Sequence, residues 1–220
     1  MVTDDDTEKR VERQMQIMTS MHFALSSSRS STVYEAVGRA GMYLTTASMT
    51  LVALGFISSA TSMDDAFYLF AFVLLSCLFL LGLVTFFRVV QTGVEDVRLA
   101  LSESRIREFY AEVSPGVDKW FDHPVKTEKA NQLRGMGSGS RFQMLLTAGS
   151  MIGGVNSAVI GAFVGLAVAR FAGASLTWAA VAGAATFAVS AALHLRQEYS
   201  MFAGAFEGSA DERARTDDRE

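Results

Sequence analysis

The chain has 220 residues, of which 50% are hydrophobic and 19% are charged, and its formal net charge at neutral pH is -4. The apolar residues are gathered in long uncharged runs, which is typical of a membrane protein. The small and distributed net charge argues against nucleic acid as a partner, and the single cysteine excludes a disulfide framework.

The N-terminal 40 residues predict a cytoplasmic helical segment with no secretory signal peptide. A heptad-like apolar stripe runs along it at Val11, Met15, Met18, His22 and Leu25. This stripe indicates an amphipathic helix packed on its own protein or at the membrane surface, or a helix that joins subunits. The serine-rich residues 26–31 are predicted to break this helix, and Thr32 with Glu35 forms a capping box for a second one.

Four charge-free runs, at residues 40–63, 66–87, 142–169 and 171–195, are each long enough to cross a bilayer. They predict spanning helices at about 41–60, 66–89, 143–169 and 175–194. The expected fold is all-α, a four-transmembrane-helix bundle with cytoplasmic amphipathic helices. Its parts are the N-terminal segment 1–40, transmembrane hairpin 1 at 41–90, a cytoplasmic helical linker at 91–141, transmembrane hairpin 2 at 142–195, and a partly disordered cytoplasmic tail at 196–220.

The distribution of positive charge predicts the orientation. Of the 19 Lys and Arg residues, only Arg170 falls in a loop on the side opposite the termini. By the positive-inside rule, both termini and the linker are therefore cytoplasmic.

The linker begins as a predicted helix that stops at Pro115 and Gly116. Within "FRVVQTGVEDVRLALSESRIREFYAEVSP", residues 87–115, a Glu-Asp pair is followed by Arg-Ile-Arg, an aromatic residue and a proline. This pattern resembles uncharacterised actinobacterial multi-pass membrane proteins. The resemblance implies a bacterial inner-membrane protein and carries over no activity and no site residue. Further along, the glycine-rich residues 135–140 are interpreted as a hinge before the third span.

Small residues recur at every fourth position of the third span. This small-residue row consists of Gly149, Gly153, Ser157, Gly161 and Gly165. Such a row either packs against another helix or lines a pore. Because each step of four residues advances by about 40° around a helix, the row is expected to be too curved for one straight neighbour. Either a partner crosses it at a right-handed angle, or its two ends face two helices. The bulky side of this helix should face lipid or an outer neighbour.

Asn156 is the one strongly polar side chain expected near the bilayer midplane. A bare amide is costly in hydrocarbon, so it needs a partner such as Thr46, Ser48 or Ser76. It is interpreted either as a link between helices or as a pore or substrate contact. The fourth span is mostly small and is expected inside the bundle, whereas the Leu- and Phe-rich second span should face lipid.

The sequence presents no catalytic constellation, no cofactor motif and no metal-ligand spacing among its histidines, His22, His123 and His194. The four charge-free runs contain no Asp, Glu, Lys or Arg, and His194 lies close to the cytoplasmic end of the fourth, where it is interpreted as an interfacial residue. This pattern disfavours proton-coupled or metal-ion-coupled transport. We therefore expect a non-enzymatic, self-associating membrane scaffold or sensor, with the lipid bilayer and a cytoplasmic protein as partners. The alternative is an oligomeric channel or pore-forming effector.

Overall fold

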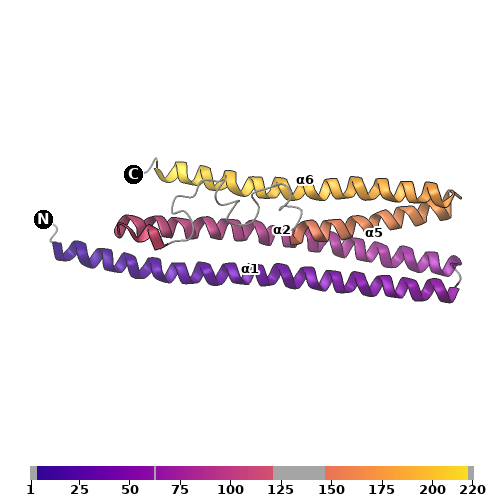
Figure 1. Ribbon diagram of the computed structural model, residues 1–220, viewed down its shortest axis with the longest axis horizontal. Coiled ribbons are helices and arrows are strands. Elements are labelled where there is room, and N and C mark those ends of the chain that lie inside the picture. The colour runs from indigo at the N-terminus through magenta and orange to yellow at the C-terminus, as the bar shows by residue number, and fades with distance from the viewer. Residues whose placement is uncertain (1–3, 62, 121–146, 218–220) are drawn as a thin grey trace. The chain divides into compact units, whose positions relative to one another are not determined.

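The computed structural model describes residues 4–61, 63–120 and 147–217. Within them lie four α-helices, α1 (Asp4–Thr61), α2 (Asp65–Val113), α5 (Ala148–Phe171) and α6 (Leu176–Asp217), and a short 3-10 helix, η1 (Val117–Trp120) (Figure 1). These ranges contain no strand, so the predicted all-α class is confirmed. Each of the four α-helices contains a segment long and apolar enough to cross a membrane.

The chain divides into two compact units. Unit 1 contains residues 1–34, 93–143 and 204–220, and unit 2 contains residues 35–92 and 144–203.

The predicted break at residues 26–31 is wrong, because α1 runs through them without interruption. Serine and threonine can bond to a carbonyl one turn back instead of capping a new helix. Ser30 donates in this way to the carbonyl of Ser26, and Thr32 donates to that of Arg29. The proposed capping residue Glu35 pairs instead with Arg39. Because these hydroxyls bond within α1, they do not cap a new helix, and α1 continues through these residues.

The ends of α2 agree with the signals in the sequence. Its start is capped by Asp64, whose carboxylate accepts from the backbone N–H groups of Ala66 and Phe67 at 3.0 and 3.3 Å. Its end comes just before Ser114 and Pro115, and Gly116 follows in the left-handed region with φ of 89°. Beyond it, Trp120 of η1 is exposed, while Phe121, His123 and the glycine-rich residues 135–140 lie outside the described residues.

In unit 1, the predicted apolar stripe on α1 packs against α2. Within residues 5–28 of α1, the stripe residues are the half-buried ones and the others are exposed, and on the facing part of α2 the buried side chains include Val97 and Ile106. Cross-contacts join Tyr110 to Thr19 and Glu103 to Arg29. The contacts support the interpretation of this segment as a helix packed on its own protein.

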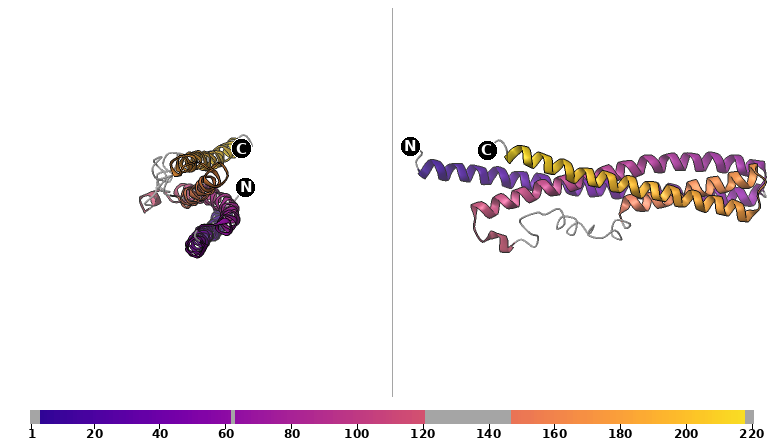
Figure 2. Two further views of the ribbon diagram at one scale, coloured as in Figure 1. Left: turned by 90° about the vertical axis from the view of Figure 1, so that its right-hand side faces the viewer. Right: turned by 90° about the horizontal axis from the view of Figure 1, so that it is seen from above.

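In unit 2, α5 and α6 lie side by side as a hairpin (Figures 1 and 2). The core of the unit consists of residues from α1, α2 and α5, namely Ala40, Tyr43, Ala47, Leu75, Leu78, Phe86, Val89, Val90, Ile152 and Val159. The bulky side of α5 thus faces these helices, and Ile152 is fully buried.

The predicted placement of the second and fourth spans is wrong. In the most apolar 18-residue segment of α2, 28% is buried, whereas in the corresponding segment of α6 only 6% is buried. The reason is size: the Leu and Phe side chains of α2 can fill the space between helices, whereas the alanines of α6 offer little surface to cover. Small residues let α6 approach α5 closely on one face and leave its other faces open.

The last helix continues beyond the predicted fourth span at 175–194. α6 reaches Asp217, inside the tail that is predicted to be partly disordered. Alanine, glutamate and arginine are frequent in this tail and are good helix formers.

Candidate functional site

The small-residue row of α5 faces α6 along its whole length. A Cβ atom at Gly161 would lie 2.8 Å from the carbonyl oxygen of Gly183, and one at Gly165 would lie 3.2 Å from that of Ala179. Such distances are shorter than ordinary van der Waals contact, so only glycine allows the two backbones to approach so closely.

The other end of the row makes room for two ionisable side chains of α6. A Cβ atom at Gly149 would lie 2.9 Å from a carboxylate oxygen of Glu198, and one at Gly153 would lie 3.0 Å from the Cβ of His194. Between these ends, Ser157 donates to the hydroxyl of Ser190 at 3.0 Å.

One antiparallel neighbour therefore accompanies all five positions, which corresponds to the alternative of a single partner along the row. At one end a second helix also approaches, because a Cβ atom at Gly149 would lie 2.9 Å from Cγ2 of Val90 in α2. Two helices that coil around each other can stay in contact although the row drifts around α5. In unit 2 the row is a packing seam between α5 and α6, and Ser157 is completely buried in it.

Glu198 is the functional candidate that the sequence reasoning missed. Its side chain is only 1% exposed, and its carboxylate accepts hydrogen bonds from the hydroxyls of Thr147 at 2.5 Å and Ser150 at 2.7 Å. Thr147 is also the N-cap of α5 and accepts from the backbone N–H of Ser150. The carboxylate thus binds the first turn of α5, where the helix dipole favours negative charge.

The signal that could have revealed Glu198 is its spacing from His194. The two residues are four apart and share the face of α6 that meets Gly149 and Gly153. Glu198 lies beyond the predicted fourth span at 175–194, in the segment 196–220 that is predicted to be a cytoplasmic tail, so the sequence gives no indication that it is buried.

His194 is buried, at 8% exposure, with its ring edge-on to Phe86 at a centroid distance of 4.6 Å. Its Nδ1 lies 2.8 Å from the carbonyl oxygen of Ser190, and since a carbonyl only accepts, Nδ1 carries the proton. Nε2 has no hydrogen-bond partner among the described residues. The ring is held as part of the packed interior of unit 2.

Asn156 is completely buried, but it faces α1 and α2 instead of the seam. Its Oδ1 accepts from the hydroxyl of Tyr43 at 3.3 Å, so the partner is not Thr46, Ser48 or Ser76 as expected. A Cβ atom at Gly82 would lie 2.2 Å from the same oxygen, so glycine is needed there. The side chain lies against protein from α1 and α2, while its Nδ2 has no hydrogen-bond partner among the described residues.

The link between Asn156 and Tyr43 can be measured with a double-mutant cycle. We expect Tyr43→Phe and Asn156→Leu each to lower the free energy of unfolding in mixed micelles, with a coupling of about 0.6 kcal/mol, since interhelical hydrogen bonds in membranes are modest. Purely additive effects would show that the two groups do not interact.

Unit 1 contains a separate polar cluster. Arg29 donates to Asp96 at 3.1 Å and to Glu103 at 2.7 Å, and Nδ1 of His22 lies 4.0 Å from Glu103. Partial burial by itself lowers the pKa of Arg29, but the hydrogen bonds to the two carboxylates outweigh it, so the pKa is raised and the guanidinium stays charged.

We expect Arg29→Gln to destabilise unit 1 by about 1–2 kcal/mol, because two carboxylates lose their counter-charge at a half-buried position. Loss of helical hydrogen-exchange protection in residues 93–113 is the measurement. Lys9→Gln, which removes only the exposed pair with Asp5, serves as the control and should change nothing. Equal protection in both variants would contradict a structural role for Arg29.

Comparisons with protein-family models, with curated proteins and with solved structures find no match for this chain. Its function is therefore argued from its own residues. No group of three or more metal-ligating side chains occurs within the described ranges.

Proposed function

We propose that this chain is a non-enzymatic scaffold or sensor of the bacterial inner membrane, with both termini in the cytoplasm. It self-associates, and its cytoplasmic helices hold a protein partner. Unit 2 is the part inserted in the bilayer. The four apolar helices support the membrane location, and the positive charges on one side of the predicted spans support the orientation.

The observation that carries the proposal is a set of exposed apolar side chains on α1 within unit 1. Ile17 is 51% exposed, Met21 is 48% exposed and Phe23 is 70% exposed. Ile17 and Met21 are one turn apart and share one side of α1, whereas Phe23 lies about 160° around the helix from Met21. All three remain uncovered although the apolar stripe packs against α2. In an aqueous compartment, such side chains favour contact with another protein surface.

Continuity of α1 supports a sensing role. Residues 4–34 of unit 1 and residues 35–61 of unit 2 belong to one helix without an interruption. A helix transmits rotation and displacement along its axis because its backbone hydrogen bonds are continuous. Binding at Met21 can in this way influence the membrane-inserted residues.

The geometry favours the scaffold over the pore. The pore alternative needs water to reach Asn156 and Ser157, but both are fully buried against neighbouring helices. On the scaffold proposal, vesicles containing the chain retain a small fluorescent dye. Leakage that Asn156→Leu abolishes, with insertion unchanged, would instead support a channel.

Cross-linking tests self-association. In a chain with Cys77→Ser, the only cysteine is removed, and Met21→Cys then provides a single thiol on the exposed apolar side. We expect a bismaleimide to yield covalent dimers in membrane vesicles. Glu12→Cys, which is exposed, about 180° around α1 from Met21 and about three turns before Phe23, is the matched control and should yield few. A single-chain mass in lipid discs, with no cross-linking at either position, would refute the proposal.

A further inference from the structure

A groove of about 860 Å³ runs along unit 2 between α2 and α6, with α5 beneath it. One wall contains Phe79, Leu83, Phe86 and Phe87 of α2, and the other contains Ala185, Val189 and Leu193 of α6. The volume lies in the range of sites that hold small ligands. The apolar walls fit a hydrocarbon chain.

The hydroxyls in this groove do not make its walls polar. Thr186 donates to the carbonyl of Ala182, and Ser190 bonds to Ser157. Nδ1 of His194 is likewise engaged by the carbonyl of Ser190. With these hydroxyls satisfied within unit 2, an acyl chain can lie against them without leaving them unpaired. Nε2 of His194 is the exception, because it has no hydrogen-bond partner among the described residues.

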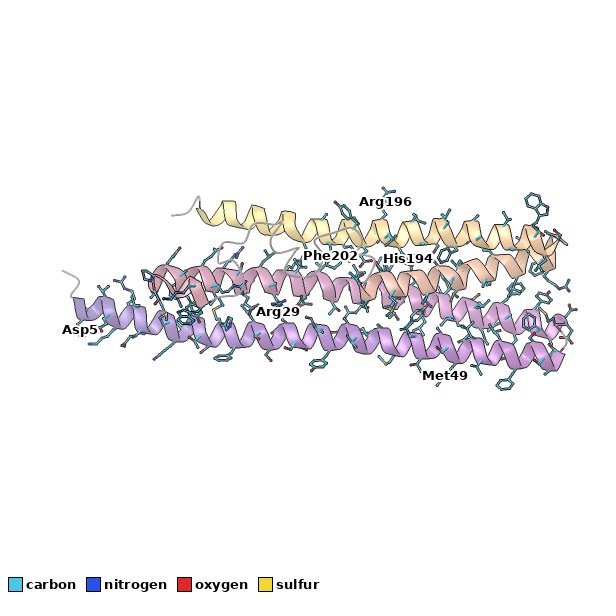
Figure 3. The ribbon with its side chains drawn as sticks, viewed as in Figure 1. Asp5, Arg29, Met49, His194, Arg196 and Phe202 are labelled. Carbon is cyan, nitrogen blue, oxygen red and sulfur yellow. The ribbon has the colours of Figure 1, made fainter. Side chains whose placement is uncertain are left out.

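One end of the groove is polar and cationic. It contains Arg196, Gln197 and Ser200, directly after the predicted end of the fourth span. Arg196 points away from the neighbouring helices (Figure 3), and no described carboxylate forms an ion pair with it. The nearby Glu198 does not neutralise it, because that carboxylate is buried against Thr147 and Ser150.

We infer that the groove binds an anionic phospholipid, with an acyl chain between α2 and α6 and the phosphate at Arg196. The apolar groove matches the hydrocarbon end of such a lipid, and the guanidinium of Arg196, which forms no ion pair within the described residues, matches its phosphate end. Arginine binds phosphate with several donors. A second copy in the same orientation fits less well, because it would bring another Arg196 to the same end. The inference requires unit 2 to lie in the membrane but does not depend on the scaffold role.

The test uses the full chain in discs that contain phosphatidylcholine and phosphatidylglycerol in equal amounts. After gentle detergent extraction, native mass spectrometry counts each retained lipid. We expect retention of phosphatidylglycerol over phosphatidylcholine by about fivefold, the effect of one arginine near the headgroups. Arg196→Gln should abolish this preference.

Two further variants make the result specific. Arg39→Gln removes an arginine that pairs with Glu35 and does not contact the groove, so it should keep the preference. Val189→Trp fills the apolar part and should reduce the retention of both lipids. Equal retention of the two lipids by the parent chain would overturn the inference. So would a loss of preference in Arg39→Gln as large as in Arg196→Gln, or a dimer mass that Val189→Trp converts to a monomer.

Discussion

Replacing Gly161 by leucine is expected to separate α5 from α6 and to lower the free energy of unfolding by about 1–3 kcal/mol or more. Its new Cβ would lie 2.8 Å from the carbonyl oxygen of Gly183 and 3.2 Å from the Cβ of Phe187. Neither atom can move without displacing the backbone of α6. The loss is measured by unfolding in mixed micelles and by earlier loss of the monodisperse peak on heating.

Gly154 provides the matched control on the same helix. A Cβ atom there has nothing within 4 Å, so Gly154→Leu introduces the same residue with no clash at its Cβ. Leucine also favours helix more than glycine does, so this variant should equal or exceed the parent in stability. If Gly161→Leu is as stable as Gly154→Leu, α5 and α6 are not in close contact.

Truncation of Glu198 is the second large effect that we expect. Glu198→Ala removes the acceptor of two hydroxyls and leaves a cavity at a position that is 1% exposed. Lost hydrogen bonds to a charged group and an unfilled cavity together should cost about 2–4 kcal/mol in the free energy of unfolding. The first turn of α5 should lose hydrogen-exchange protection before the rest of the helix.

Two substitutions test whether the loss of stability in Glu198→Ala is specific to the carboxylate or follows from any substitution in this part of α6. Glu198→Gln keeps the shape and one acceptor oxygen, and we expect it to lose less than about 1 kcal/mol. Gln197→Ala alters the neighbouring residue, which is exposed, and should be neutral. Equal stability of Glu198→Ala and the parent would mean that the carboxylate does not bind Thr147 and Ser150.

Local patterns in the sequence predicted the membrane class, the all-α fold, the apolar stripe on α1 and the end of α2. Each of these depends on residues close together in the chain. Long uncharged runs need no tertiary information to be recognised as possible spans, and Pro115 with Gly116 cannot continue a helix. The predicted break at residues 26–31 is wrong, because a serine can either cap a new helix or bond to a carbonyl of the same helix. Which of the two occurs depends on whether the neighbouring turns are helical.

For the candidate site, the sequence identified the small-residue row and the need of Asn156 for a partner, but not what either one contacts. A row of small side chains predicts that some helix packs closely against it, and only the tertiary structure shows that this helix is α6. In the same way, the amide of Asn156 must find a donor, and Tyr43 is 113 residues away in the chain.

What the sequence determined by itself is thus the all-α class and the presence of four helices apolar enough to cross a membrane, since composition and periodicity are properties of single helices. Tertiary structure alone decided which faces are buried: α2 central, α6 exposed on most sides, and Glu198 hidden at the start of α5. The physical reason is that burial depends on the volumes of several helices fitted together. The neighbouring helix therefore decides whether a row of glycines is a helix contact, whether a charged residue beyond a span is buried, and how much of an alanine-rich helix is exposed.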